Sequence, residues 1–230
     1  MVSVIEREEE EQLQMIQEST RDFAETYIRP HLMEWDEAQI FPVELFRKLG
    51  EYGLMGVLVP EEYGGAGLGY QEYISVIVEI SKVCSSIGLS VAAHNSLCTN
   101  HILMFGNEEQ KQKYLPKLAS GVHVGCFGLT EPDHGSDPDS MIINAKEASG
   151  GYLLNSAKMW ISNSPIADVF VVWAKIENGD IRDFILDKGM DGLSAPKIKG
   201  KLSLRSSVTG EIVMQNVFVP IEKMLKMCPA

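Results

Sequence analysis

The segment DVFVVWAKIENGDIRDFILD, residues 168–187, decides the fold class of the second half of the chain. Two runs rich in β-branched and aromatic residues, 168–176 and 181–187, flank a short polar stretch that contains Asn178 and Gly179. An Asn-Gly pair between two such runs is a strong signal for a type I′ turn, in which both central residues have positive φ. The segment therefore predicts a β-hairpin.

Other strand-like runs lie on both sides of this hairpin. Residues 141–148 and 152–160 surround a turn at Gly150 and Gly151, and residues 211–219 form a further run rich in β-branched side chains. No helical pattern separates these runs. Six or so short strands in succession predict a small antiparallel sandwich or barrel.

The first half of the chain has helical spacing instead. Apolar residues recur every three or four positions in the segments 8–28, 71–83 and 86–105. Asn107, with Gln110 three residues later, has the pattern of a capping box that begins one more helix. We therefore predict an α+β fold, with an all-helical domain over residues 1–122 and a β domain over residues 123–230.

The balance of charge limits the classes of partner. The chain has 230 residues, 32 of them acidic and 20 basic, and a formal net charge of −12. This excess of negative charge repels phosphate backbones, so we expect no nucleic-acid partner. No apolar run approaches the roughly 18 residues that a membrane-spanning helix needs, so we expect no membrane span.

The N-terminal segment, residues 1–11, is rich in acids and has no apolar core. A secretory signal needs such a core, and a mitochondrial transit peptide is rich in arginine and poor in acids, so the segment has the pattern of neither. We expect a cytoplasmic protein in a bacterium or, in a eukaryote, a protein of the mitochondrial matrix with no transit peptide visible.

Cysteine and histidine give no sign of a metal site. The cysteines are Cys84, Cys98, Cys126 and Cys228. They form no C-x-x-C pair and no cluster with histidine at metal-ligand spacing, so we interpret them as small buried side chains in a reducing compartment. His94 and His101 lie in an apolar segment without such partners and are interpreted as structural histidines.

Two polar segments at predicted strand ends carry side chains suited to a flat aromatic ligand. The first is FGLTEPDHGSD, residues 127–137, and the second is KMWISNS, residues 158–164, which places Trp160 beside Ser162. An indole and hydroxyl groups at strand ends can stack on an aromatic ring and hydrogen-bond to it. An ordinary solvated loop and a core tryptophan beside a turn are the alternatives that these residues alone leave open.

Four motifs together resemble the acyl-CoA dehydrogenase family. Residues 128–137 are similar to the family signature G-L-T-E-x-x-G-G-S-D, with His134 at a place where the family varies. The family's W-I-T/S segment matches Trp160, Ile161 and Ser162. Its motifs P-E-E-Y-G-G and E-E-Q-K-x-K-Y-L-P match residues 60–65 and 108–116. The matches follow the family's order across nearly the whole chain.

The resemblance implies FAD as the cofactor and an acyl-CoA thioester as the substrate. It assigns flavin contacts to Phe127, Leu129, Thr130, Trp160, Ile161 and Ser162. In the family, a proton leaves the acyl α-carbon and a hydride passes from the β-carbon to the flavin. The hydroxyl at Thr130 then hydrogen-bonds the flavin ring, Trp160 packs beside it, and Ser162 hydrogen-bonds near the hydride-accepting nitrogen.

The resemblance also bears on the substrate. It places Ser136 against the pantetheine portion of acyl-CoA. Glutaryl-specific members hold the distal carboxylate with an Arg-Ser pair, and the matching positions here are Gly88 and Leu89, neither of which can pair with a carboxylate. We therefore expect a short, unbranched monocarboxylic acyl-CoA. Glutaryl-CoA dehydrogenase is the alternative, because the second half of the chain resembles that branch whereas the first half is closer to short-chain bacterial members.

In the family the catalytic base is a glutamate in a C-terminal four-helix domain, beyond the position that corresponds to residue 230. Glu131 and Glu211 do not occupy its place, and residues 226–230 depart from the family sequence. We therefore expect a fragment that lacks the C-terminal domain, contains no catalytic residue and is inactive by itself.

The same resemblance implies a role in fatty-acid metabolism or amino-acid degradation. It also implies electron-transfer flavoprotein as the acceptor and a homotetramer for a full-length parent, with a monomer or dimer expected for this chain. Three alternatives stay open: a non-catalytic flavin or acyl-CoA binding module, an acyl-CoA oxidase, and a fragment that does not fold by itself because apolar surface is left uncovered.

Overall fold

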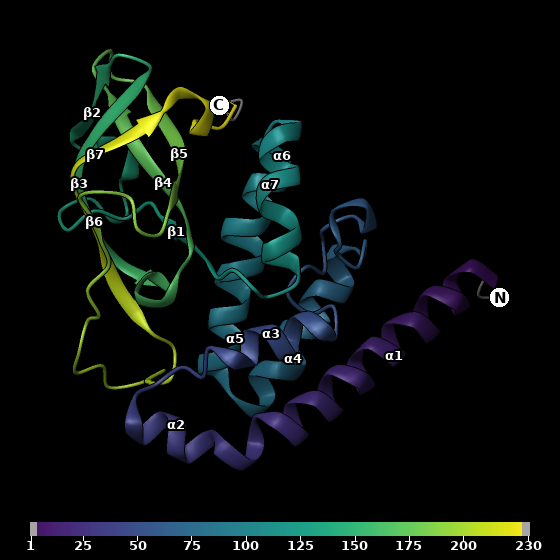
Figure 1. The fold of residues 1–230 in the computed structure, drawn as a ribbon. Helices are drawn as coiled ribbons and strands as arrows, with labels where there is room; N and C mark the ends of the chain where they lie inside the picture. Colours follow the sequence, from purple (N-terminus) through teal and green to yellow (C-terminus); the bar gives the residue numbers. More distant parts are fainter. Residues whose placement is uncertain (1–3, 227–230) are drawn as a thin grey trace.

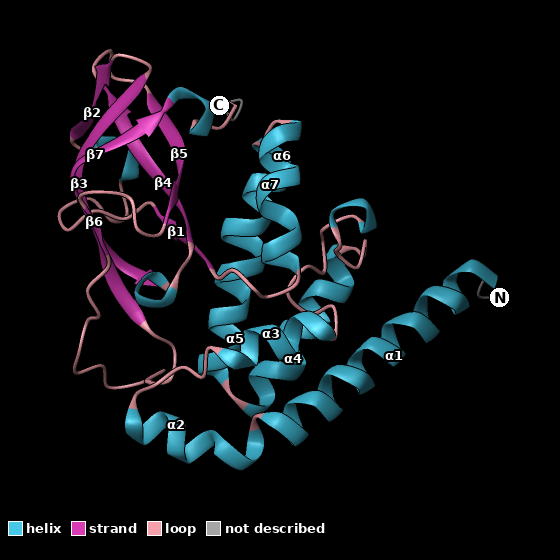
Figure 2. Cartoon of the chain, in the orientation of Figure 1, coloured by secondary structure: helices cyan, strands magenta, loops and turns pink. Residues whose placement is uncertain are grey.

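The computed structural model describes residues 4–226, in which a helical part lies beside a curled β-sheet (Figures 1 and 2). The helices are α1 (Val4–Tyr27), α2 (Leu32–Ala38), α3 (Glu44–Glu51), α4 (Tyr70–Val83), α5 (Ser85–Ala92), a π-helical segment (Ala93–Thr99), α6 (Asn100–Phe105) and α7 (Glu108–Ala119). The strands are β1 (Gly125–Gly128), β2 (Ile143–Ala148), β3 (Gly151–Ser162), β4 (Val169–Ile176), β5 (Ile181–Asp187), β6 (Leu193–Ser194) and β7 (Thr209–Pro220). The predicted α+β class is confirmed.

The start of α7 follows the predicted capping box. The backbone N–H of Gln110 donates to Asn107 Oδ1 at 2.9 Å, and the Gln110 side chain accepts from the Asn107 N–H at 2.8 Å. This pairing satisfies two N–H groups that the first turn of a helix otherwise leaves free. The predicted boundary between residues 122 and 123 falls in the connection between α7 and β1, and it stays a prediction.

The segment predicted as one helix over residues 86–105 contains a π-helical stretch, Ala93–Thr99, between α5 and α6. Its wider turn buries His94 and Asn95. The Asn95 side chain donates to the backbone oxygens of Leu54 and Val91 at 3.1 and 3.2 Å. Apolar spacing does not reveal this stretch, because hydrophobic periodicity is judged over windows of about 11–18 residues and does not resolve one turn.

The sheet is mixed, which differs from the wholly antiparallel arrangement expected. Its strand order is β1-β4-β2-β3-β7-β6. Strand β5 lies outside this order and pairs with β4. Both β1 and β2 run parallel to β4. The antiparallel prediction fails at β1, because this strand follows the helical part directly and pairs with β4, the fourth strand in the sequence, instead of with β2.

The predicted hairpin between β4 and β5 exists, but its turn is not type I′. Gly179 has a φ of +91°, whereas Asn178 is not left-handed. The Gly179 N–H donates to Ile176 O at 2.9 Å, and the Ile176 N–H donates to Asp180 O at 2.8 Å. A three-residue loop with one left-handed glycine, a G1 bulge, satisfies the same Asn-Gly sequence.

The sequence of β4 is almost continuously apolar because both faces of this strand are covered. Val169 and Val171 pack in a buried cluster with Leu115 and Leu118 of α7. The alternate face of the strand contributes to the separate core enclosed by the curled sheet. A strand buried on two faces reads as an apolar run without alternation. The helical part and the sheet therefore share one buried interface.

A buried histidine and a buried aspartate also join the two parts. His94 is fully buried, and its Nδ1 accepts from the Gly125 N–H of β1 at 3.0 Å while its Nε2 lies 3.1 Å from Leu118 O. His101 Nε2 lies 2.5 Å from Oδ2 of the buried Asp183 in β5. Both histidines therefore have the structural role expected of them.

Burial lowers the pKa of His94 to about 4, from an ordinary value of 6.5. The unfolded chain therefore takes up a proton at this histidine below pH 6.5, whereas the folded chain stays neutral down to about pH 4. We expect the free energy of unfolding to fall by roughly 3 kcal/mol across this window because of His94 alone. Urea titrations from pH 7 to pH 4 measure the fall. A His94→Gln variant should lose that part of the pH dependence, and an unchanged pH profile would contradict the assignment.

Cys84, Cys98 and Cys126 are buried with free thiols, as expected, and Cys228 lies outside the described residues. Across residues 4–226, no three His, Cys, Asp or Glu side chains come together in a way that could hold a metal ion. None of the described helices is both long enough and apolar enough to cross a membrane.

Candidate functional site

The end of β3 has an unusual backbone at Trp160. This residue has a φ of +63°, a left-handed conformation that is rare for a bulky side chain, and its side chain is 58% exposed. The pairing of β3 with β7 shifts register between Lys158 and Ile161, so Trp160 lies in a bulge. A left-handed non-glycine residue costs about 1–3 kcal/mol, and such strain is concentrated at functional sites. The bulge holds a large aromatic face toward solvent.

Two hydroxyl groups lie on the same framework as this indole. The Met159 N–H donates to Thr130 O at 2.9 Å, which fixes the turn after β1 beside the residue that precedes Trp160. Ser162 pairs with Thr209 of β7 at the end of the strand. Both Thr130 and Ser162 are half-buried, and neither hydroxyl hydrogen-bonds to another described residue. Each is therefore free to hydrogen-bond a ligand.

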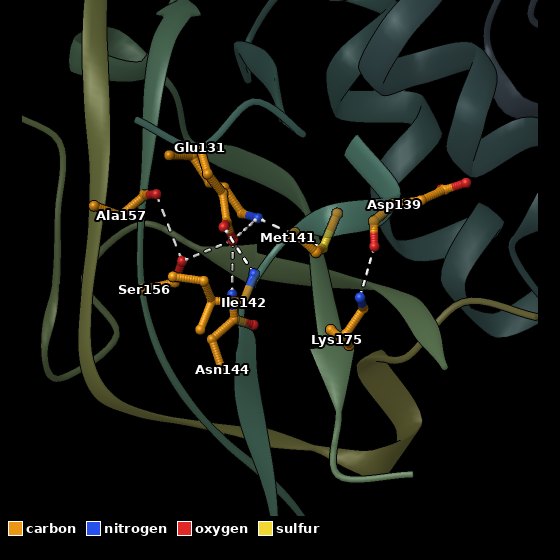
Figure 3. Close-up of polar contacts among 9 residues, drawn as sticks. Glu131, Asp139, Met141, Ile142, Asn144, Ser156, Ala157 and Lys175 are labelled. Atoms are coloured by element: carbon orange, nitrogen blue, oxygen red, sulfur yellow. Dashed lines mark hydrogen bonds and ion pairs between the residues drawn. The ribbon is translucent and has the colours of Figure 1, made fainter. Parts of the chain in front are cut away.

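The turn after β1 is anchored by Glu131, which is 5% exposed (Figure 3). Its carboxylate accepts from Lys158 Nζ at 2.9 Å, from Asn144 Nδ2 at 2.8 Å, from the Ile142 N–H at 3.1 Å and from Ser156 Oγ at 3.3 Å. These partners come from β2, β3 and the segment before β2. The carboxylate is thus the centre of a buried polar cluster that holds the turn on the sheet.

The charges in this cluster are set by two opposing effects. Burial alone raises the pKa of Glu131, but the hydrogen bonds from Lys158 and the Ile142 N–H outweigh it, so the pKa lies below its ordinary value. Burial lowers the pKa of Lys158, and its contact with Glu131 limits that fall. A carboxylate with lowered pKa and occupied oxygens is a poor proton acceptor. Glu131 is therefore suited to anchor the turn and not to act as a base.

The side chain of Phe127 points toward the helical part. Its ring lies 5.4 Å from that of His101 and 6.2 Å from that of Trp173, between ring centroids. Leu129 is half-buried in the turn, and Ile161 is 4% exposed and packs in the sheet core. Flavin contacts at these three residues stay predictions, and their burial suits backbone contacts better than side-chain ones.

Ser136 is exposed on the same turn as Glu131. A cavity of about 220 Å³ lies beside the turn and is lined by Asp133 and His134. Ser136 does not line that cavity and makes no hydrogen bond to another described residue. Its proposed contact with pantetheine stays a prediction.

Gly88 and Leu89 occupy different surroundings in α5. A Cβ at Gly88 would lie 2.0 Å from Ser81 Oγ of α4, so close helix packing accounts for the glycine. Leu89 is 38% exposed, and the next residue, Ser90, contacts the residue after Ser162 through its backbone oxygen. Leu89 therefore lies near the end of β3. A role in substrate binding is a prediction for both residues.

Sequence reasoning assigned no role to Lys158 or Asn163, which the structure places beside the site. One signal was available for Lys158: in β3 the even-numbered residues Tyr152 and Leu154 face the core, and the same alternation carries Lys158 inward. A buried lysine needs a carboxylate partner, and the signature carries Glu131. Asn163 gave no such signal, because an asparagine after a strand suggests an ordinary turn.

Comparisons with known proteins identify the same two parts. Residues 10–122 match the acyl-CoA dehydrogenase N-terminal domain, and residues 126–217 match the acyl-CoA dehydrogenase middle domain. The mitochondrial isovaleryl-CoA dehydrogenase of Solanum tuberosum is 46% identical over 214 residues, which cover 90% of this chain and 52% of that protein. The short-chain specific acyl-CoA dehydrogenase of Clostridium acetobutylicum is 40% identical over 216 residues, covering 92% and 57%.

A solved structure agrees with this result. The glutaryl-CoA dehydrogenase from Mycobacterium smegmatis, in complex with FADH2, superposes with a TM-score of 0.91 at 37% identity, over 95% of this chain and 56% of that one. This chain spans about half the length of the curated relatives it matches. The short-chain and glutaryl branches that the sequence resembles are both found among the matches, together with the isovaleryl branch, which the sequence motifs do not indicate. The chain belongs to the acyl-CoA dehydrogenase family and carries its N-terminal helical domain and its middle domain.

Proposed function

We propose that this chain binds FAD and a short-chain acyl-CoA, and that it forms part of the site of an acyl-CoA dehydrogenase. The observation that carries the proposal is the strained, exposed Trp160 with the free hydroxyls of Thr130 and Ser162 on the same framework. Indole faces stack on aromatic rings, and hydroxyl groups hydrogen-bond ring nitrogens and carbonyls. These residues suit an isoalloxazine ring.

FAD, when bound, supplies the acceptor for the hydride that leaves the β-carbon. The residues of this chain would orient the ring: Trp160 by stacking, and Thr130 and Ser162 by hydrogen bonds. Abstraction of the α-proton needs a base within hydrogen-bond reach, and Glu131 is buried, paired and low in pKa. We therefore propose that this chain by itself has negligible dehydrogenase turnover.

The proposed substrate is an unbranched acyl-CoA of short chain length. Gly88 and Leu89 offer no partner for a second carboxylate, which makes glutaryl-CoA the weaker candidate. Isovaleryl-CoA is a second candidate, because the chain is 46% identical to an isovaleryl-CoA dehydrogenase. Competition for FAD-loaded protein by butyryl-, isovaleryl- and glutaryl-CoA would rank the three. Tightest binding of glutaryl-CoA would contradict the argument from Gly88 and Leu89.

An anaerobic titration tests the proposed function. Purified protein is mixed with FAD, butyryl-CoA is added, and the visible absorption of the flavin is followed. We expect FAD to bind, with a shift in its spectrum on addition of butyryl-CoA and no bleaching. Rapid bleaching would show that a competent base lies within these residues. Absence of FAD binding would contradict the proposal, and an unfolded far-UV spectrum would favour a fragment that does not fold alone.

The wider assignments are proposals of the same kind. Electron-transfer flavoprotein is the proposed acceptor, with a homotetramer for a longer parent and a monomer or dimer for this chain. A non-catalytic flavin or acyl-CoA binding module would show binding without reduction even when a longer parent is used. An oxidase would consume oxygen with substrate. The proposed compartment is the cytoplasm of a bacterium or the mitochondrial matrix of a eukaryote.

A further inference from the structure

A single buried side chain joins the end of β3 to the helical part. Asn163 directly follows Ser162 and is fully buried. Its Nδ2 donates to Ser90 O of α5 at 2.9 Å and lies 3.4 Å from Gly125 O of β1. Its backbone N–H donates to Val208 O at 2.8 Å. One asparagine therefore contacts three segments that are far apart in the sequence.

The groups around this amide are polar and buried. Ser90 Oγ donates to Ser207 Oγ at 3.1 Å, and both serines are fully buried. Ser164 Oγ, also buried, donates to Ile161 O at 3.1 Å. These bonds connect α5, the end of β3 and the residues that precede β7. The residues around Ser162 are thereby held to α5 and to the segment before β7 by buried hydrogen bonds.

Asn163 carries two unfavourable features at once. Its φ is +68°, and its Oδ1 is buried without a hydrogen-bond partner among the described residues. A buried unsatisfied acceptor costs about 1–3 kcal/mol, and the left-handed conformation adds to that cost even for asparagine, which tolerates it best among non-glycine residues. A residue that only filled space in the core would not be expected to combine a left-handed backbone with an unsatisfied buried oxygen.

The left-handed residues Trp160 and Asn163 lie on either side of Ile161 and Ser162. The geometry of this short segment is therefore determined at both ends. At the first end the bulge turns the indole outward, and at the second end the amide of Asn163 ties the backbone to Ser90 and Gly125. Loss of the amide bonds would leave the backbone bond from the Asn163 N–H to Val208 O as the remaining hydrogen bond between this residue and a distant segment.

We infer that Asn163 is a positioning residue: it holds Trp160 and Ser162 in the arrangement that the flavin ring requires and couples that arrangement to α5, which carries Leu89. The inference rests on the proposed function for its ligand. It goes beyond that function in naming the side chain that sets the geometry of the site without contacting the ligand.

The test compares Asn163→Gly with Asn95→Ala. Glycine keeps the left-handed backbone of residue 163 and removes the side chain, its amide included. Asn95 is the matched control, because it is a buried amide that also donates to two backbone oxygens, Leu54 O and Val91 O, but lies entirely within the helical part. Asn163→Gly loses the bonds to Ser90 O and Gly125 O but also removes the unsatisfied Oδ1 and the cost of a left-handed side chain, so stability alone does not separate the two variants.

Two readouts separate positioning from stability. The first uses protein labelled with 5-fluorotryptophan and no flavin: the ¹⁹F resonance of Trp160, assigned by its loss in Trp160→Phe, should shift in Asn163→Gly and stay in place in Asn95→Ala. The second is FAD affinity from quenching of flavin fluorescence, which should fall about tenfold, or ~1.4 kcal/mol, in Asn163→Gly only.

An unshifted Trp160 resonance together with unchanged FAD affinity in Asn163→Gly would overturn the inference. Equal changes in both variants would do the same, because they would indicate general loosening. If the unaltered chain binds no FAD, the proposed function fails, and the Trp160 resonance alone decides whether Asn163 positions the strand end. Should Asn163→Gly not fold, Asn163→Ser, which retains a shorter polar group, is measured with the same two readouts.

Discussion

Replacing Glu131 with glutamine is expected to lower the free energy of unfolding by about 3–5 kcal/mol. The change leaves the ammonium group of Lys158, which has no exposed surface, without its counter-charge. That group must then either stay charged in a dry interior or lose its proton at neutral pH, and both outcomes are unfavourable. Urea denaturation followed by far-UV circular dichroism measures the loss.

The double variant Glu131→Gln, Lys158→Met is the decisive comparison. Methionine fills a similar volume without charge, and the glutamine oxygen can still accept from Asn144 Nδ2 or the Ile142 N–H. The double variant should therefore be more stable than Glu131→Gln alone, since removing both charges of a buried pair is often nearly neutral. The single variant Lys158→Met completes the comparison. If the stability losses of the two single variants add up to the loss of the double variant, the ion pair contributes nothing specific.

Removing the indole of Trp160 is expected to lower FAD affinity at least about tenfold, because stacking of an aromatic side chain on a base contributes roughly 1–3 kcal/mol. Trp160→Ala and Trp160→Gly should lose affinity equally, since both lack the ring. Trp160→Phe keeps an aromatic face and should retain most of the affinity. Titration of each variant with FAD, followed by flavin fluorescence, gives the dissociation constants.

The same set of variants tests the backbone strain at Trp160. Because residue 160 has a φ of +63°, Trp160→Gly should be more stable to urea than Trp160→Ala by about 1 kcal/mol. The two variants differ only in a methyl group, so the difference isolates the backbone. If alanine is as stable as glycine here, the bulge relaxes when the indole is removed, and the strain would then be a consequence of the side chain itself.

Local sequence patterns predicted the parts of the molecule that depend on local interactions. The capping box at Asn107 and Gln110 formed as predicted, because its two hydrogen bonds join residues three apart. The hairpin between β4 and β5 formed for the same reason. The prediction of a type I′ turn was wrong. An Asn-Gly pair is compatible both with a type I′ turn and with a three-residue loop that has a left-handed glycine, and the flanking strands select between the two.

The sequence motifs also located the candidate site but not its geometry. They named Thr130, Trp160 and Ser162, which the structure places on one framework. They did not predict the left-handed backbone of Trp160, which depends on a register shift against β7. Register is a property of two paired strands, so the pattern of one strand alone cannot specify it.

The sequence by itself determined the α+β class, the order of helices before strands and the family, because these follow from periodicity, turn residues and short motifs along one stretch of chain. The tertiary structure decided the parallel pairing of β1 with β4, the burial of Lys158 against Glu131 and the contact of Asn163 with Ser90. Each of these joins residues more than 25 positions apart. Their energies depend on desolvation and on packing between segments, which exist only after the chain has folded.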